Sequence, residues 1–355
     1  MSMNKAFPRI KTPKSSYTFD YPKAIEYADL QNSVFWLWNE IKVEKDIQDL
    51  KVNATPAEQH ATITALKLFT KYELHVGMGY WGDVVVRRYP RPDIQRMANC
   101  FSFFELNVHA PFYNEINRVL GLATDEFYDS YVDDPVLKDR IDFIEGILDH
   151  KNELLSTAGF TFIEGGVLYS SFALLKHFQS NGKNLNVNIC RGVNFSNRDE
   201  NIHAEAGAWL FKTHKAEEDL TKDEEEKLEA AVRYIAEQVF YHESRIIDMF
   251  FEKGPIDGIT DLQMKNFVKS RINICLENLG YSKMYDVTYN PIAEWFYDGI
   301  NNFQFNDFFS GVGASYNRSW VESEFEWLPD GGSSEDVAAN DATSGIENNK
   351  LVNIA

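Results

Sequence analysis

Helix start and stop signals divide the chain into long segments and leave few places for β-hairpins. Thr55 stands three residues before Glu58 and is followed by Pro56, which makes a capping box with proline at the first helical position. Similar starts occur at Asp134-Pro135, Thr221 and Thr260, and glycines suited to helix ends occur at Gly121, Gly182, Gly254 and Gly280. The intervening segments are roughly 20–30 residues long and are joined by short loops, so we predict an all-α helical bundle.

Charge and composition exclude several classes of protein. The chain carries 54 acidic against 35 basic side chains, a net charge of −19, which disfavours binding to nucleic acid or to an anionic membrane surface. No run approaches the ~18 apolar residues of a membrane span, and the N-terminus has no apolar stretch to serve as a signal peptide. Cys100, Cys190 and Cys275 form no CxxC pair, which excludes a thiolate zinc site and a disulfide framework. We therefore expect a soluble, cytoplasmic protein.

Four of the predicted helices carry a glutamate inside apolar or aromatic surroundings, where a carboxylate without a counter-charge is costly to bury. These residues are Glu73, Glu105, Glu164 and Glu200. His109 follows Glu105 by four residues and His203 follows Glu200 by three, and at ~100° per residue each pair shares a helix face. Two such pairs and two single glutamates are the ligands of a dimetal-carboxylate site in a four-helix core. Oxygen-rich ligation with one imidazole per metal suits iron or manganese.

Each of these residues also has an ordinary structural explanation. The Glu-x-x-His spacing occurs by chance on solvated helices, Glu73 is equally suited to a helix surface, and His109 is equally suited to a hydrogen-bonded core position. The repeated order of single acid and acid–histidine pair along the chain favours the metal site. The remaining histidines fit no such pattern and are interpreted as structural or surface groups: His60, His75, His150, His177, His214 and His242.

Several segments resemble the small, radical-generating (beta) subunit of class I ribonucleotide reductase. They are NRDENIH (197–203), FIEGGVLYSSF (162–172), HAPFY (109–113), LENLGY (276–281) and NPIAEW (290–295), and the resemblance runs from about residue 30 to about residue 320. The resemblance implies a ferritin-like bundle. It also implies one metal held by Glu73, Glu105 and His109 and a second held by Glu164, Glu200 and His203, with Glu105 and Glu200 as bridging carboxylates.

The same resemblance implies roles in catalysis. Tyr113 occupies the position of the radical tyrosine, Trp36 resembles the electron-relay tryptophan, and Asp199 resembles the acid that links this indole to His109. Trp38 is a rival for the relay position. The expected cofactors are two transition-metal ions per chain, with an iron pair expected and Mn/Fe or Mn/Mn as alternatives, and O2 for activation. Side chains expected to line the radical are Phe104, Phe112, Leu168 and Phe172.

The implied enzyme is a ribonucleoside-diphosphate reductase, whose large (alpha) subunit binds the nucleotides. We expect residues 1–30 to form an N-terminal arm, residues 31–325 to form the ferritin-like domain, and residues 326–355 to form a flexible tail that docks on the large subunit. A homodimer is also expected. Two other functions remain open at this stage: a related dimetal oxidase that acts on a bound ligand, and a ferritin-type iron store.

Four departures from the family pattern carry expectations of their own. The family usually has aspartate where Glu73 stands, so the identity of the metal remains open. One extra residue separates Glu105 from His109, and such an insertion is commonly absorbed as a π-bulge. Glu164 and Glu200 are 36 residues apart, slightly more than usual, which predicts a second irregularity within 188–197. No tyrosine follows Tyr316, so either Trp320 or Trp327 replaces the tyrosine of the family's tail, or the radical takes a different route.

Overall fold

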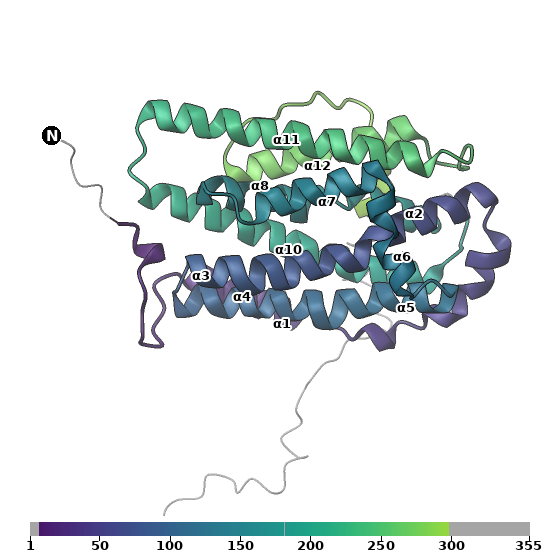
Figure 1. Cartoon of the computed structure of the whole chain (residues 1–355), viewed down its shortest axis with the longest axis horizontal. Helices are drawn as coiled ribbons and strands as arrows, with labels where there is room; N and C mark the ends of the chain where they lie inside the picture. Colours follow the sequence, from purple (N-terminus) through teal and green to yellow (C-terminus); the bar gives the residue numbers. More distant parts are fainter. Residues whose placement is uncertain (1–6, 181, 298–355) are drawn as a thin grey trace, which may run out of the picture. The chain divides into compact units, whose positions relative to one another are not determined.

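The computed structural model describes residues 7–180 and 182–297, and within these ranges the chain is helical with no β-strand (Figure 1). The predicted all-α fold is therefore confirmed. The α-helices are α1 (Pro22–Ser33), α2 (Pro56–Leu74), α3 (Val86–Arg88), α4 (Pro92–Phe104), α5 (Ala110–Leu120), α6 (Asp125–Asp129), α7 (Pro135–Leu148), α8 (Glu153–Gly165), α9 (Tyr169–His177), α10 (Val187–Glu217), α11 (Lys222–Phe250) and α12 (Asp261–Leu279). The 3-10 helices are η1 (Arg9–Lys11), η2 (Trp38–Glu40), η3 (Val43–Asp46) and η7 (Ser130–Asp133), and the π-helical segments are η4 (Asp49–Asn53), η5 (His75–Val85) and η6 (Glu105–His109).

The helix boundaries follow the sequence signals closely. Thr55, Thr221 and Thr260 each form a complete capping box at the start of α2, α11 and α12. The glycines at 121 and 280 end α5 and α12 in the left-handed conformation, with φ of 79° and 91°, which a residue without a Cβ adopts at little cost. The helices before Gly182 and Gly254 end earlier, at His177 and Phe250, so these two glycines lie in connecting turns.

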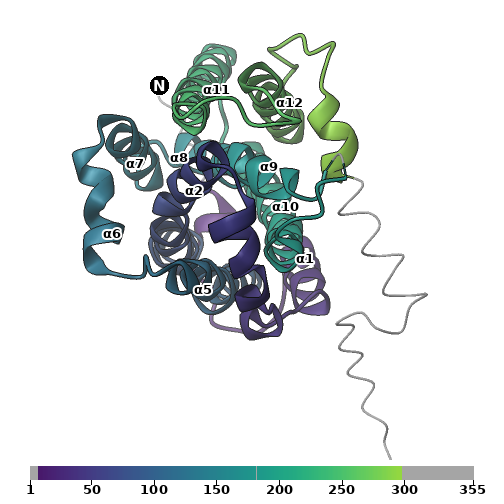
Figure 2. The same ribbon diagram turned by 90° about the vertical axis from the view of Figure 1, so that its right-hand side faces the viewer.

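Four helical rods enclose the core. They are α2 with η5, the continuous rod α4–η6–α5, α8 with α9, and α10, and their apolar faces belong to one buried cluster. Figure 2 shows these rods end-on, with α11 and α12 packed along one side of α8 and α10. Helix α1 covers α4 and α10 on another side. This arrangement places the centres of four rods around a common buried space.

Two of the rods are irregular where they approach each other. The extra residue between Glu105 and His109 is absorbed in η6, which confirms the predicted π-bulge. The longer π-helical segment η5 was not predicted. Gly77 of η5 lies so close to η6 that a Cβ there would meet the Glu105 Cβ at 2.8 Å, so a residue without a side chain is required at this contact.

The irregularity predicted within 188–197 is wrong, because α10 is regular from Val187 to Glu217. The break occurs instead directly after Glu164. Helix α8 ends at Gly165, and Leu168 adopts a positive φ of 72° before α9 begins at Tyr169. The interruption therefore lies just after the predicted ligand Glu164 rather than within α10, the helix that carries Glu200.

One stretch is long and apolar enough to cross a membrane by composition, contrary to the expectation that no run reaches that length. Residues Glu153–His177 span 25 residues, and their most apolar window has a mean hydropathy of 1.3. All of that window is buried inside the helical bundle, as in the core helix of a globular domain.

The predicted N-terminal arm is described from residue 7 onward. Ile10 is buried and its backbone N–H donates to Glu217 Oε2 at 2.7 Å, which ties the segment to the end of α10. Helix α1 begins at Pro22 and runs across the boundary that we predicted at residue 30. The predicted tail at 326–355, together with Trp320 and Trp327, lies outside the described residues.

Candidate metal centre

All six predicted ligands converge between the four rods, and each is at most 1% exposed. They form two overlapping groups, in each of which one ligand atom per residue lies within 4.8 Å of the others. The first group is Glu73, Glu105, His109 and Glu200, and the second is Glu105, Glu164, Glu200 and His203. The two groups share Glu105 and Glu200, the residues expected to bridge the metals.

One half of the cluster is arranged around His109, at the end of η6. Its Nδ1 lies 2.9 Å from Glu105 Oε2, 3.3 Å from Glu200 Oε1 and 3.8 Å from Glu73 Oε2. Glu73 reaches this point from the last turn of α2, and Glu200 reaches it from the middle of α10. Three rods therefore supply the atoms of this half.

The other half is arranged around His203 of α10. Its Nδ1 lies 2.7 Å from Glu105 Oε1, 3.4 Å from Glu200 Oε2 and 3.9 Å from Glu164 Oε1. Glu164 belongs to the last turn of α8. The oxygens of Glu105 and Glu200 that face His203 are not the ones that face His109. Each of these two carboxylates therefore presents one oxygen to each imidazole.

The donor atoms that line the cluster fit two metal ions. Many of them have no hydrogen-bond partner in the part of the chain that the structure describes, although buried polar atoms are normally paired. These atoms are both oxygens of Glu73 and of Glu200, Glu105 Oε1, Glu164 Oε2 and both ring nitrogens of His203. Two divalent cations would supply the missing partners and balance the four carboxylate charges. The set of oxygens with one imidazole per half suits iron or manganese.

Electrostatics at the cluster also favour bound cations. Burial and the neighbouring Glu105 carboxylate raise the pKa of Glu73 well above its usual range, and burial and Glu200 do the same to the pKa of Glu164. Burial alone would lower the pKa of His203, but the Glu105 carboxylate raises it to about 9. The crowded carboxylates thus compete for positive charge, whether from protons or from metal ions.

Trp81, which is not among the predicted site residues, contacts one of the ligands. Trp81 Nε1 donates a hydrogen bond to Glu164 Oε1 at 2.6 Å, and the indole ring packs on Phe101 and Tyr80. This bond satisfies one carboxylate oxygen and fixes the orientation of the other, as partners of metal ligands usually do. Trp81 lies on the unpredicted segment η5, so no helical spacing in the sequence pointed to it.

A hydrogen-bonded chain leads from the cluster to a buried indole. His109 Nε2 lies 3.1 Å from Asp199 Oδ2, and the same oxygen accepts a hydrogen bond from Trp36 Nε1 at 2.8 Å. The Trp36 ring stacks on the His109 ring at a centroid distance of 6.0 Å. Trp36 is 3% exposed, whereas its rival Trp38 is only partly buried against the core. The structure therefore joins Trp36 to Asp199 and His109.

Tyr113 lies on α5, one turn beyond His109, and is completely buried. Its hydroxyl donates to Ser196 Oγ at 3.0 Å, and its ring stacks on Phe69 at 4.1 Å between centroids. Phe112, one of the expected lining residues, lies 5.0 Å from the Tyr113 ring. Phe69 and Ser196 were missed, because they come from rods whose facing sides the sequence pattern does not specify.

The other expected lining residues, Phe104, Leu168 and Phe172, are also buried. Phe172 packs on the far partner Phe69, with ring centroids 5.6 Å apart, and Phe104 packs against Phe35 at 5.5 Å. Leu168 forms the turn between α8 and α9.

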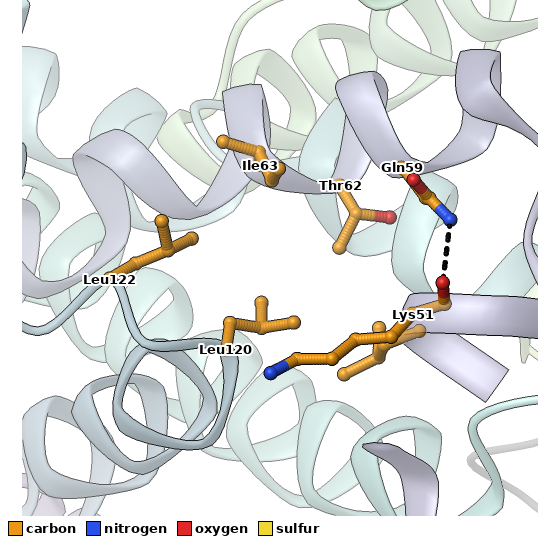
Figure 3. Close-up of a pocket in the computed structure, with 7 residues that line it drawn as sticks. Lys51, Gln59, Thr62, Ile63, Leu120 and Leu122 are labelled. Atoms are coloured by element: carbon orange, nitrogen blue, oxygen red, sulfur yellow. Dashed lines mark hydrogen bonds between the residues drawn. The ribbon is translucent and has the colours of Figure 1, made fainter. Parts of the chain in front are cut away.

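A surface pocket of about 190 Å³ opens between η4, α2 and the residues that follow α5 (Figure 3). Its lining residues are Leu50, Lys51, Gln59, Thr62, Ile63, Leu120 and Leu122, and none of them belongs to the metal cluster. Figure 3 shows the Gln59 amide bonded to the Lys51 carbonyl at the pocket rim.

A helical bundle that gathers four glutamates and two histidines in this order defines a ferritin-like protein with a dimetal-carboxylate site. Within that class the comparison with known families is specific. Residues 14–291 match the family described as ribonucleotide reductase, small chain, and the chain belongs to this family. It is thus the small subunit of an oxidoreductase that acts together with a large subunit.

Individual relatives agree with this assignment. The chain is 25% identical over 344 residues to a probable ribonucleoside-diphosphate reductase small subunit of Invertebrate iridescent virus 3. The matched region covers 90% of this chain and 89% of the relative. It is 26% identical over 246 residues to the ribonucleoside-diphosphate reductase subunit beta of Halalkalibacterium halodurans, with coverage of 65% and 68%.

Solved structures share the fold. Dimanganese(II)-NrdF of Streptococcus sanguinis superimposes with a TM-score of 0.71 at 20% identity, covering 81% of this chain and 99% of that chain. A putative class I ribonucleotide reductase from Bacillus halodurans gives a TM-score of 0.70 at 21% identity, with coverage of 79% and 100%.

Proposed function

We propose that the cluster binds two transition-metal ions and that the chain uses them to generate a radical for its large subunit. The observation that carries this proposal is the way Glu105 and Glu200 each divide their oxygens between the two halves of the cluster. Two iron ions are the proposed pair. Manganese in one or both positions is the alternative, and it is supported by the extra reach of Glu73 and by a structural neighbour described as a dimanganese(II) protein. Bound here, the ions would supply the activation of O2.

Tyr113 is the proposed site of the radical. Burial, together with the charge of Glu73, raises the pKa of Tyr113 well above its usual range, so the phenol keeps its proton until an electron is removed. Both that electron and the phenol proton would pass to the oxidised metal centre, so that a neutral radical remains. Until then the hydrogen bond to Ser196 Oγ holds the hydroxyl in place. The rings of Phe69 and Phe112 exclude water and reductants from it.

Asp199 and Trp36 form the proposed route between the radical centre and the large subunit. Asp199 Oδ2 holds the Trp36 N–H and the His109 Nε2 together, so an electron that leaves Trp36 can be accompanied by a shift of the shared proton. The side chain of Arg198 lies beside Asp199 and lowers the pKa of that carboxyl despite its burial, which keeps it ionised as an acceptor.

The tail at 326–355 is proposed to dock on the large subunit through Leu351, Val352 and Ile354. Its polar, acidic composition is typical of a segment that orders only on binding. Deleting the last twenty or so residues is expected to leave metal content and the radical unchanged and to abolish nucleotide reduction with the large subunit. Full turnover by the truncated chain would contradict this role.

A homodimer and a cytoplasmic location complete the proposal. Leu74, Met78 and Phe103 are exposed apolar side chains on the neighbouring elements α2, η5 and α4, and they offer a surface for a second copy of the chain. Sedimentation or light scattering at several concentrations tests this dimer.

Two other functions are disfavoured. The pocket of Figure 3 is lined by residues outside the metal cluster, so it gives no support to a dimetal oxidase that acts on a bound ligand. A ferritin-type store has no need of a buried tyrosine or of an indole bonded to Asp199. Metal analysis combined with electron paramagnetic resonance of the O2-activated protein tests the proposal. Two ions per chain and a tyrosyl signal are expected, and fewer ions or no radical signal of any kind would contradict it.

A further inference from the structure

Arg271 of α12 is a buried cation without a carboxylate partner among the described residues. The side chain is 3% exposed, and its guanidinium lies 3.9 Å from the centre of the Tyr169 ring. A buried charge is costly unless hydrogen bonds satisfy it, so the partners of this guanidinium are informative. Its hydrogen bonds within the described residues go to neutral oxygens.

Two of those oxygens belong to residues that directly follow metal ligands. Arg271 Nε donates to the Gly165 carbonyl at 3.0 Å, and Nη2 donates to Asn201 Oδ1 at 2.9 Å. Gly165 follows Glu164, and Asn201 follows Glu200. A single planar side chain therefore joins the end of α8 to the middle of α10 beside the His203 half of the cluster.

The break in α8 explains why such a link is needed. The helix ends one residue after Glu164, so the last carbonyls of α8 lose the amide partners that a continuing helix would provide. The Val167 N–H returns to the Phe162 carbonyl, and Arg271 takes the carbonyl of Gly165. Without that bond the final turn, which carries Glu164, would have an unsatisfied buried acceptor.

The network extends in two further directions. The hydroxyl of Tyr169, at the start of α9, donates to the same Asn201 oxygen at 2.9 Å. Arg271 Nη1 lies 3.0 Å from the hydroxyl of Tyr297, within the helical residues 291–297 at the end of the described chain. The fork geometry of arginine matches several fixed acceptors at once, which a lysine ammonium does not.

We propose that Arg271 is a positioning residue that sets the geometry of the second half of the metal centre, formed by Glu164, Glu200 and His203. This inference rests on the proposed dimetal function. It holds that the direction of the hydrogen bonds, rather than the positive charge, is what the ligands require. The first half, around Glu73 and His109, meets this network only through the shared ligand Glu200, which precedes Asn201, and should depend on it less.

The test measures Mn²⁺ binding to the metal-free full chain in two backgrounds that isolate the halves. Glu73→Gln leaves the second half intact, and Glu164→Gln leaves the first. Arg271→Lys is added to each, and bound Mn²⁺ is counted by the loss of the free-ion paramagnetic resonance signal. In the Glu73→Gln background we expect affinity to fall about 10- to 100-fold, the usual effect of removing a partner of a metal ligand. In the Glu164→Gln background, where Arg271 acts only through the shared Glu200, we expect a clearly smaller loss of affinity.

Arg140→Lys provides the matched control. Arg140 is also a buried arginine, and it pairs with Glu243 at 2.9 Å. Glu243 is neither a predicted metal ligand nor a chain neighbour of one. The Arg140→Lys substitution should lower thermal stability without changing Mn²⁺ affinity in either background. Equal weakening in both backgrounds, no weakening in either, or the same weakening from Arg140→Lys would overturn the inference and leave the metal site intact. A wild-type chain that binds no Mn²⁺ would overturn the proposed function instead.

Tyr297→Phe keeps the test decisive if Arg271→Lys does not fold. It removes one of the arginine's acceptors without leaving a buried charge in a new place. A smaller loss of Mn²⁺ affinity is expected than from Arg271→Lys, and it should again be larger in the Glu73→Gln background. Unchanged affinity in that background would overturn the inference.

Discussion

Glu105 and Glu200 divide their carboxylate oxygens in the same way, one toward His109 and one toward His203. The four distances lie between 2.7 and 3.4 Å, although the two glutamates come from different rods of the bundle. Two ions bound in the two halves would therefore share both carboxylates. Glu73 and Glu164 would each serve one ion, which gives the four glutamates unequal importance.

Substitution of a shared glutamate should affect both ions, and substitution of an end glutamate should affect one. We expect Glu105→Gln to lower the affinity for both ions by at least about tenfold, because both lose a charged ligand. Glu73→Gln should lower the affinity for one ion by a similar factor. Equilibrium dialysis with metal analysis measures this directly. Glu243→Gln is the control, since Glu243 is equally buried but pairs with Arg140. Identical losses in the two ligand variants would show that Glu105 does not bridge.

Tyr113→Phe should separate metal binding from radical storage. The substitution removes only the hydroxyl that donates to Ser196, and the ring keeps its packing on Phe69. Metal content should therefore equal that of the wild type, while the tyrosyl signal and nucleotide reduction should disappear. Electron paramagnetic resonance after exposure to O2 measures the signal, and a tyrosyl signal of undiminished intensity would assign the radical to a different tyrosine.

Trp36→Phe and Trp38→Phe form a matched pair. Trp36 donates to Asp199, and its loss should abolish turnover with the large subunit while metal binding persists. Trp38 is only partly buried, and it is Trp36 that holds the bond to Asp199, so Trp38→Phe should keep turnover close to that of the wild type. Steady-state assays of both variants with the large subunit decide between the two indoles, and the opposite pattern would transfer the relay role to Trp38.

The metal ligands could be predicted from the sequence better than the side chains that surround them. The caps at Thr55, Thr221 and Thr260 and the spacing of the ligands are local patterns, and the structure reproduces them. An extra residue between Glu105 and His109 was enough to predict η6. Contacts such as Trp81 with Glu164 depend on how one rod is rotated against another. That rotation is set by packing across the whole core, which no short pattern records.

The misplaced irregularity has a similar origin. Counting residues between Glu164 and Glu200 showed that extra length had to be accommodated, but not where. The glycines at 165 and 166, and the hydrogen bond that Arg271 donates to the Gly165 carbonyl, let the chain break after Glu164, and α10 stays regular. The location was fixed by a partner on α12, far away in the sequence.

A buried histidine away from the metal centre should make the protein acid-labile. Burial, followed by the charge of Lys183, lowers the pKa of His177 from 6.5 to about 4. Unfolded chains take up a proton below pH 6.5 that the folded protein accepts only near pH 4, so the free energy of unfolding should fall as pH drops through this window. The contribution is at most about 3 kcal/mol.

Denaturant unfolding of wild type and His177→Asn at several pH values measures this contribution. The difference between the two proteins isolates His177 from the titration of the metal ligands. We expect the stability of the wild type, relative to the variant, to decline from pH 6.5 to pH 4 and to stay level above pH 7. A difference that does not change with pH would mean that His177 is protonated equally in the folded and unfolded states.

Magnetic coupling between two bound ions tests the shared carboxylates most directly. The metal-free chain is loaded with Mn²⁺, the ions are counted by metal analysis, and the paramagnetic resonance spectrum is recorded. With Glu105 and Glu200 as common ligands, two Mn²⁺ per chain should give the spectrum of a coupled pair. One ion per chain, or two ions with the spectra of isolated Mn²⁺, would contradict a centre bridged by Glu105 and Glu200.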